Sequence, residues 1–74
     1  MKIYSNHYTI SKENSKKIIE HFKDKIKSKS IYLGGGYFGL INNKILEINT
    51  LSINRNKSIL SELENRFKFK LKAA

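Results

Sequence analysis

The stretch from Ile31 to Ile53, IYLGGGYFGLINNKILEINTLSI, constrains the fold most, because it holds every glycine of the chain and most of its strand-forming residues. Apolar, β-branched and aromatic residues bounded by Gly and Asn predict strands. We read the stretch as two strands joined by a turn at Asn42-Asn43, since Asn accepts positive φ better than other residues that carry a side chain. Helical patterns on both sides predict a sheet onto which two helices fold.

The residues before this stretch predict a strand followed by a helix. Residues Lys2 to Ile10 alternate with period two and are rich in β-branched and aromatic side chains. Ser11 is suited to cap a helix, and Glu13 complements the positive end of its dipole. The helix is expected from Lys12 to about Ser28. Its apolar stripe contains Ile18, Ile19, Phe22 and Ile26.

The residues after Ile48 leave the fold open. Period two shifts by one near Asn49-Thr50, which indicates a β-bulge or the end of the strand. A short helix from Lys57 to about Glu64, followed by a strand over Arg66–Lys72, gives an α+β fold with an antiparallel sheet and two helices on one face, in the order βαββαβ. This is the ferredoxin-like split βαβ arrangement. A helix over the whole of 58–72 gives βαββα instead and leaves a sheet edge open for a partner.

Length and composition favour a single small domain over residues 1–74. The 8.6 kDa chain has no cysteine, so disulfides and thiolate metal sites are excluded. The N-terminus lacks the apolar segment of a signal peptide, and no apolar run reaches about 18 residues. We therefore expect a cytoplasmic protein without a membrane partner, cofactor or small-molecule substrate.

The charge points to polyanionic partners. Lys and Arg number 15 against 6 Asp and Glu, a formal net charge of +9 at pH 7, and such a field attracts nucleic acid or acidic protein surfaces. Codon bias offers a second explanation. The chain is rich in Ile, Lys and Asn, the residues of A+T-rich codons, and Lys far outnumbers Arg.

Two groups of cations are candidates for nucleic-acid binding. On the predicted last strand, alternate residues project from the uncovered face of the sheet: Arg66, Lys68, Lys70 and Lys72. Along one flank of the predicted first helix lie Lys12, Lys16, Lys23 and Lys27. Tyr4 and Tyr8 are the candidates for stacking against bases. The structural alternatives are a lysine-protected edge strand and lysines that extend along the edge of the core.

The segment GGGYFG from Gly34 to Gly39 fits the pattern G-x-G-x-x-G. A dinucleotide-binding turn must open a helix, whereas a strand follows here, and the chain is too short for that domain. The segment also resembles a kinase glycine-rich loop, but the H-R-D and D-F-G motifs of kinases are missing. The glycines then serve either to bring backbone amides close to an anion or to form a bend under a helix. We take Gly35, Tyr37 and Phe38 as a candidate partner-binding surface.

His7 and His21 are the only imidazoles. Their spacing supports no metal site, so we expect none. Small toxin ribonucleases work with a His, a Tyr and a few Lys or Arg, so an RNA-cleaving enzyme stays an alternative.

A non-enzymatic binder of nucleic acid or of a nucleoprotein or nuclease complex is the favoured function. In its small size, basic charge and lack of cysteine the chain resembles accessory proteins of phages and mobile elements. Many of those, anti-CRISPR proteins among them, bind a host nucleoprotein or nuclease, so the resemblance implies an inhibitor of host defence. The alternatives are a protein-interaction module or homodimer that joins through a sheet edge, and the toxin ribonuclease.

Overall fold

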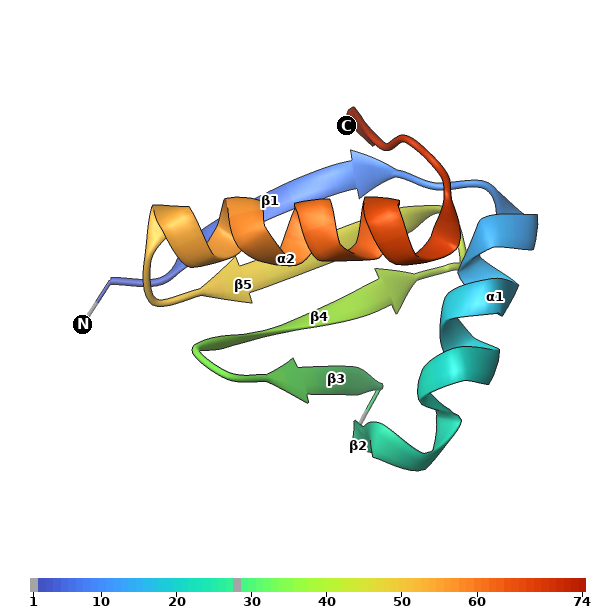
Figure 1. Cartoon of the computed structure of the whole chain (residues 1–74), viewed down its shortest axis with the longest axis horizontal. Helices are drawn as coiled ribbons and strands as arrows, with labels where there is room; N and C mark the ends of the chain where they lie inside the picture. Colours follow the sequence, from blue (N-terminus) through green and yellow to red (C-terminus); the bar gives the residue numbers. More distant parts are fainter. Residues whose placement is uncertain (1, 28) are drawn as a thin grey trace.

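The computed structural model describes residues 2–27 and 29–74 as an antiparallel sheet with two α-helices packed on one of its faces (Figure 1). The elements follow in the order β1 (Tyr4–Thr9), α1 (Lys12–Phe22), a 3-10 turn η1 (Lys23–Lys25), β2 (Ile26–Lys27), β3 (Ser30–Leu33), β4 (Gly36–Ile41), β5 (Ile45–Thr50), α2 (Ile53–Phe67) and β6 (Lys72–Ala73). The predicted α+β class with two helices is confirmed. In the described ranges, no helix combines the length and the apolar character needed to cross a membrane.

The strand order is β2-β3-β4-β5-β1-β6, and every neighbouring pair is antiparallel. The layout therefore differs from the predicted ferredoxin-like arrangement, because the stretch from Ile31 to Ile53 contributes to three strands instead of two. The additional turn lies at Gly34-Gly35, between the paired residues Leu33 and Gly36, with Gly35 at φ +79°. Glycine adopts this conformation without steric cost, so the glycines form a hairpin turn.

Other local predictions are confirmed. Residues 4–9 form a strand, and Asn42 and Asn43 make a turn with φ of 53° and 56°. The Ser11 side chain accepts the backbone N–H of Asn14 at 3.1 Å and caps α1. The pairing of β5 continues through Asn49 without a bulge, and the strand ends at Thr50.

The helix predicted from Lys12 to about Ser28 is shorter, because α1 ends at Phe22 and the chain turns back into the sheet. Ile26 pairs with Ile31 in β2–β3, so it belongs to a strand and not to the helix. Ser28, the predicted end of the helix, lies outside the described residues. At the other end of α1, the hydroxyl of the buried Ser15 donates to Asn43 Oδ1 at 3.2 Å and joins the helix to the β4–β5 turn.

The last segment differs from both sequence-based alternatives. Helix α2 begins at Ile53, includes Arg66 and Phe67, and ends where Lys68 takes the left-handed conformation. The strand predicted over Arg66–Lys72 is wrong: only Lys72–Ala73 pair, with Thr9 and Tyr8. Phe67, Phe69 and Leu71 are partly buried and pack against the core, Phe67 from the last residue of α2 and the other two from the segment between α2 and β6.

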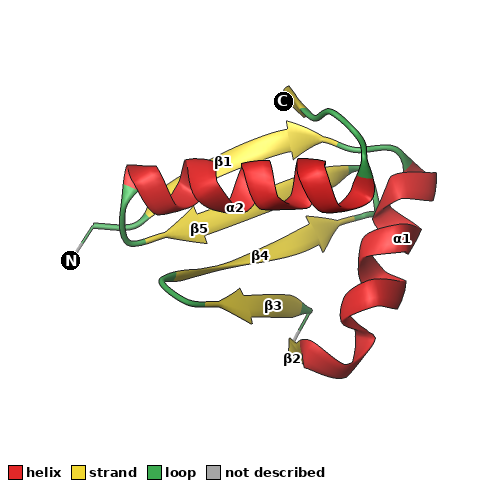
Figure 2. Cartoon of the chain, viewed as in Figure 1, coloured by secondary structure: helices red, strands yellow, loops and turns green. Residues whose placement is uncertain are grey.

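The core lies between the two helices and the sheet face that they cover. Figure 2 shows α2 lying across the sheet and α1 beside one end of it. Fully or almost fully buried side chains from both layers meet there: Ile18 and Phe22 of α1, Ile59 and Leu63 of α2, and Ile31, Phe38, Leu46 and Ile48 of the sheet. Asn56 of α2 is also buried, and its Nδ2 donates to the backbone carbonyls of Tyr4 and Ile48, each at 3.1 Å. This amide fixes α2 over β1 and β5.

Candidate functional site

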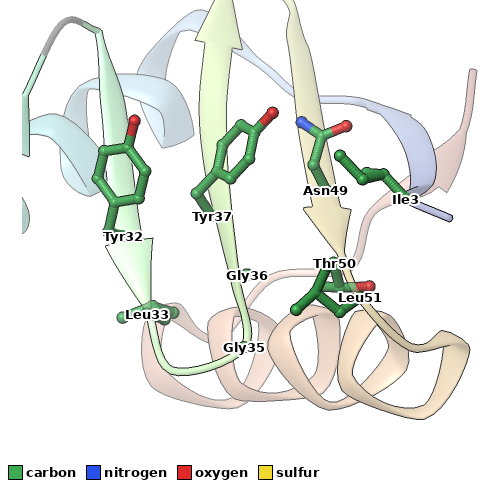
Figure 3. Close-up of a pocket in the computed structure, with 9 residues that line it drawn as sticks. All are labelled: Ile3, Tyr32, Leu33, Gly35, Gly36, Tyr37, Asn49, Thr50 and Leu51. Carbon is green, nitrogen blue, oxygen red and sulfur yellow. The ribbon is translucent and has the colours of Figure 1, made fainter. Parts of the chain in front are cut away.

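The sheet face opposite the helices carries the candidate site, and we call it the open face. Because side chains alternate along a strand, the neighbours of the buried residues Ile31, Phe38 and Ile48 project from the other side. In the observed register the open face comprises Ser5, His7 and Thr9 of β1, Ile45, Glu47 and Asn49 of β5, Tyr37, Gly39 and Ile41 of β4, and Ser30 and Tyr32 of β3. Figure 3 shows Tyr32, Tyr37 and Asn49 side by side on this face, with α2 behind the sheet.

Two tyrosines stand next to each other at the end of the open face near the Gly34-Gly35 turn. Tyr32 and Tyr37 are paired across β3 and β4, and their ring centroids lie 5.4 Å apart at an interplanar angle of 40°. Tyr32 is 56% exposed. The rings border a shallow hollow of about 300 Å³, the tyrosine hollow, whose lining is Ile3, Tyr32, Leu33, Gly35, Gly36, Tyr37, Asn49, Thr50 and Leu51. Its surface is therefore aromatic and apolar although solvent reaches it.

A polar cluster lies beside the tyrosines on β1 and β5. Glu47 Oε1 accepts from Asn49 Nδ2 at 3.0 Å, and Glu47 Oε2 accepts from His7 Nε2 at 2.7 Å. Ser5 Oγ in turn donates to Asn49 Oδ1. The Asn49 hydrogen bond, together with the hydrogen bond and charge of His7, holds the pKa of Glu47 below its ordinary value against the opposing effect of partial burial. The cluster presents an ionised, oriented carboxylate on the open face.

A second hollow lies on the open face next to Tyr37. Gly39 lacks a side chain at the position between Tyr37 and Ile41, and it pairs with Ser30 on one side and Glu47 on the other. The resulting glycine hollow has a volume of about 320 Å³, and its lining is Lys29, Ser30, Gly39, Leu40, Ile41, Asn42 and Glu47. It differs from the tyrosine hollow in combining the hydroxyl of Ser30 and the carboxylate of Glu47 around a backbone floor.

Some of the predicted cations flank the open face. Lys27 pairs with Ser30, and Lys72 pairs with Thr9, so both belong to open-face positions at opposite edges of the sheet. Both side chains are exposed. Lys29, which the sequence did not single out, lies at the rim of the glycine hollow. The open face is therefore bordered by positive charge at both edges.

The other predicted cations do not form the expected rows. Arg66 lies in the last turn of α2 with Nη2 3.9 Å from Glu62 Oε1, Lys68 caps the helix and Lys70 lies outside β6. The prediction that these cations form a row on one strand is therefore wrong. Lys12 and Lys16 lie on α1, but Lys23 belongs to η1 and donates to Glu20 at 3.3 Å. Because the helix ends before Lys23 and Lys27, the predicted basic flank is not continuous.

The glycine-rich segment divides between the two faces. Phe38 is fully buried in the core, so it is unavailable to a partner, whereas Tyr37 lies on the open face. Gly35 lies in the turn beside Arg55 of α2, whose Nε donates to the carbonyl of Gly34. Tyr4 and Tyr8, the expected stacking residues, pair with Thr50 and Leu46 and therefore belong to the helix-covered face.

The two histidines lie on opposite sides of the sheet. His7 projects from the open face toward Glu47, whereas His21 of α1 packs edge-on against Phe22 and Phe67 on the helix side. The sheet separates them, so they do not form one acid–base pair. Within residues 2–27 and 29–74, no cluster of three or more His, Asp or Glu side chains is arranged to hold a metal ion.

Sequence reasoning missed Tyr32, Glu47 and Lys29 as site residues. A signal for Tyr32 was present, because period two in Ile31-Tyr32-Leu33 sets it opposite its apolar neighbours. Glu47 and Lys29 could not be identified from the sequence, because only the strand register brings them close to Gly39. No protein-family model, curated protein or solved structure gives a significant match to the chain.

Proposed function

We propose that this protein binds single-stranded nucleic acid across the open face of its sheet, without catalysing a reaction. The observation that carries the proposal is the pair formed by the exposed Tyr32 and the half-buried Tyr37, whose ring centroids are 5.4 Å apart on neighbouring strands. Aromatic side chains on a sheet surface are stacking platforms for unpaired bases, because every base offers a π-face.

The distribution of charge supports this choice of ligand. The chain has a net charge of +9, and Lys27 and Lys72 border the open face at opposite edges of the sheet. A strand that crosses the face from one edge to the other meets cations at both ends and aromatic rings between them. Binding of this kind releases counterions, so the affinity falls steeply with salt.

The test is titration of labelled single-stranded RNA and DNA with the purified protein, by fluorescence anisotropy at about 50 and 200 mM salt. Tyr32→Ala and Tyr37→Ala should each weaken binding by about 5- to 150-fold, the range for loss of one base stack. Tyr32→Phe is the matched control, because it keeps the ring and should bind as the parent does. Unchanged affinity in both alanine variants, with the folds intact, would exclude the open face as the interface.

A charge-matched comparison locates the interface independently. The pair Lys27→Glu and Lys72→Glu changes the net charge as much as the pair Lys12→Glu and Lys16→Glu on α1. The first pair should lower the affinity far more, because those lysines adjoin the open face. The opposite ranking would move the interface to α1.

A homodimer through the open face is the second candidate, favoured by the exposed apolar side chains Ile3 and Leu51, each 54% exposed beside the tyrosine hollow. Apolar association is insensitive to salt, whereas repulsion between two copies of charge +9 opposes it at low salt. Sedimentation equilibrium distinguishes the candidates. A dimer mass that Leu51→Asp abolishes would support the second candidate over the first.

A further inference from the structure

The glycine hollow has a shape that any side chain at position 39 would change. A Cβ built on Gly39 would come 3.1 Å from the carbonyl oxygen of Lys29 and 3.9 Å from Ser30 Oγ. The floor of the hollow is therefore backbone, and its walls come from the strands on both sides. Its volume of about 320 Å³ lies at the lower end of the roughly 300–1,000 Å³ typical of small-ligand sites.

The carboxylate of Glu47 is an unusual group for a face that contacts nucleic acid, because it repels phosphate. It is held in a fixed position, since Asn49 and His7 each donate to a different carboxylate oxygen. Each oxygen accepts at more than one site, and the side chain remains 35% exposed. Glu47 is thus an oriented pair of acceptors that can receive N–H groups from a ligand in the hollow.

Another wall supplies a donor. Ser30 offers a hydroxyl on the side of Gly39 that faces β3. A ligand that complements these walls has adjacent N–H donors toward Glu47 and an acceptor toward Ser30. Among the four bases, guanine has this pattern along one edge, with N1–H and the 2-amino group as donors beside O6 as acceptor. Uracil offers one N–H between two carbonyl oxygens, and those oxygens would face the carboxylate.

We propose that the glycine hollow is a guanine-selective base site, in which Glu47 accepts from N1–H and the 2-amino group while Ser30 donates to O6. This inference rests on the proposed function and adds a sequence preference to it. Tyr37 is two residues from Gly39 on the same face, about 6.5–7 Å along the strand. A nucleotide next to the bound guanine is therefore in reach of the tyrosine pair.

The experiment uses the full chain and labelled oligouridine strands of equal length that carry one central G, A, C or inosine. A central G should tighten binding by about 5- to 150-fold relative to uridine, the range for a bidentate base contact. Inosine, which lacks the 2-amino group, should lose part of that gain. The same order is expected for DNA strands with thymidine as the background.

Glu47→Gln replaces one acceptor with a donor and should remove the preference for G, measured as the ratio of the affinities of the same variant for the central-G strand and the all-uridine strand. Glu62→Gln on α2 makes the same charge change away from the open face and should keep the preference. Glu47→Gln also disturbs the polar cluster, so Gly39→Ala serves as a second variant. Its added methyl group changes the shape of the hollow and should also remove the preference for G. Thermal melts establish that each variant is folded. Equal affinity for all strands, or a G preference that survives in both variants, would overturn the guanine site and leave the proposed function standing. No binding to any strand at low salt would overturn the proposed function, and the guanine site with it.

Discussion

Gly36 lies directly opposite Thr50 across β4 and β5, so closely that a Cβ built on Gly36 would come 2.5 Å from Thr50 Cγ2 and 2.7 Å from the carbonyl oxygen of Asn49. Thr50 is almost fully buried, and its hydroxyl donates to the carbonyl of Ser52 at 2.6 Å, just before α2 begins. The close approach therefore links the strand that carries Tyr37 to the start of the helix on the other face.

Gly36→Ala should destabilise the fold by about 1–3 kcal/mol, the usual range for overpacking. The added methyl group meets backbone and a buried threonine, which cannot move aside as a flexible side chain would. Urea denaturation followed by circular dichroism measures the change. Gly34→Ala is the matched control, because nothing lies within 4 Å of its added Cβ. Equal midpoints for the two variants would show that the strands separate at Gly36 at little cost.

Asn56→Ala should lower the free energy of unfolding by about 1–3 kcal/mol, because it removes two hydrogen bonds, each worth about 0.5–1.5 kcal/mol. The amide is 2% exposed and joins α2 to the carbonyls of Tyr4 and Ile48. Asn54→Ala, at an exposed position in the same turn of α2, is the control and should change stability little. A loss as large in Asn54→Ala would show that the two buried hydrogen bonds of Asn56 are not the cause, because alanine has the higher helix propensity at both positions.

The parts of the fold that depend on interactions between residues close in sequence could be predicted. The Ser11 cap, the turn at Asn42-Asn43 and the strand over residues 4–9 depend on residues close in sequence, and the structure contains all three. The core positions Ile18 and Phe22 followed from helical periodicity in the same way. These features need no knowledge of how distant segments pair.

The remaining features depend on tertiary contacts. A run of glycines is compatible with a bulge, a bend or a turn, and only the pairing of Leu33 with Gly36 selects the turn. The alternation of Phe67, Phe69 and Leu71 resembles a strand, but the Glu64 side chain accepts the backbone N–H of Leu71 at 2.9 Å and Phe69 stacks on Phe67, so the chain folds back on α2. The candidate site requires the register of the sheet, which sets residues from distant segments side by side.

Lys68→Gly should stabilise the protein by about 0.5–1 kcal/mol. The variant removes the free-energy cost of holding a residue with a side chain in the left-handed conformation, and the greater entropy of glycine in the unfolded chain offsets part of that gain. Lys68 has φ 59° and ψ 41° and closes α2 with a bond from its backbone N–H to the carbonyl of Glu64. Thermal denaturation of the parent and variant measures the gain. Lys70→Gly removes the same charge at a position outside the cap and should bring no gain. A gain of equal size there would identify relief of charge repulsion as the cause.

Glu47 should make stability depend on acid pH. Its pKa is lowered in the folded protein by the Asn49 hydrogen bond, with a further contribution from His7, so its ionised form is favoured by folding. That stabilisation is fully present above the ordinary value of 4.5 and is lost as the pH falls through the lowered folded value. The difference in unfolding free energy between the parent and Glu47→Gln should therefore be constant above the ordinary value and shrink below it, as urea titrations over that range would measure. In a His7→Ala background the same difference should be smaller but present, because Asn49 still donates to the carboxylate. A difference that does not vary with pH would mean that the carboxylate gains nothing from its partners on the open face.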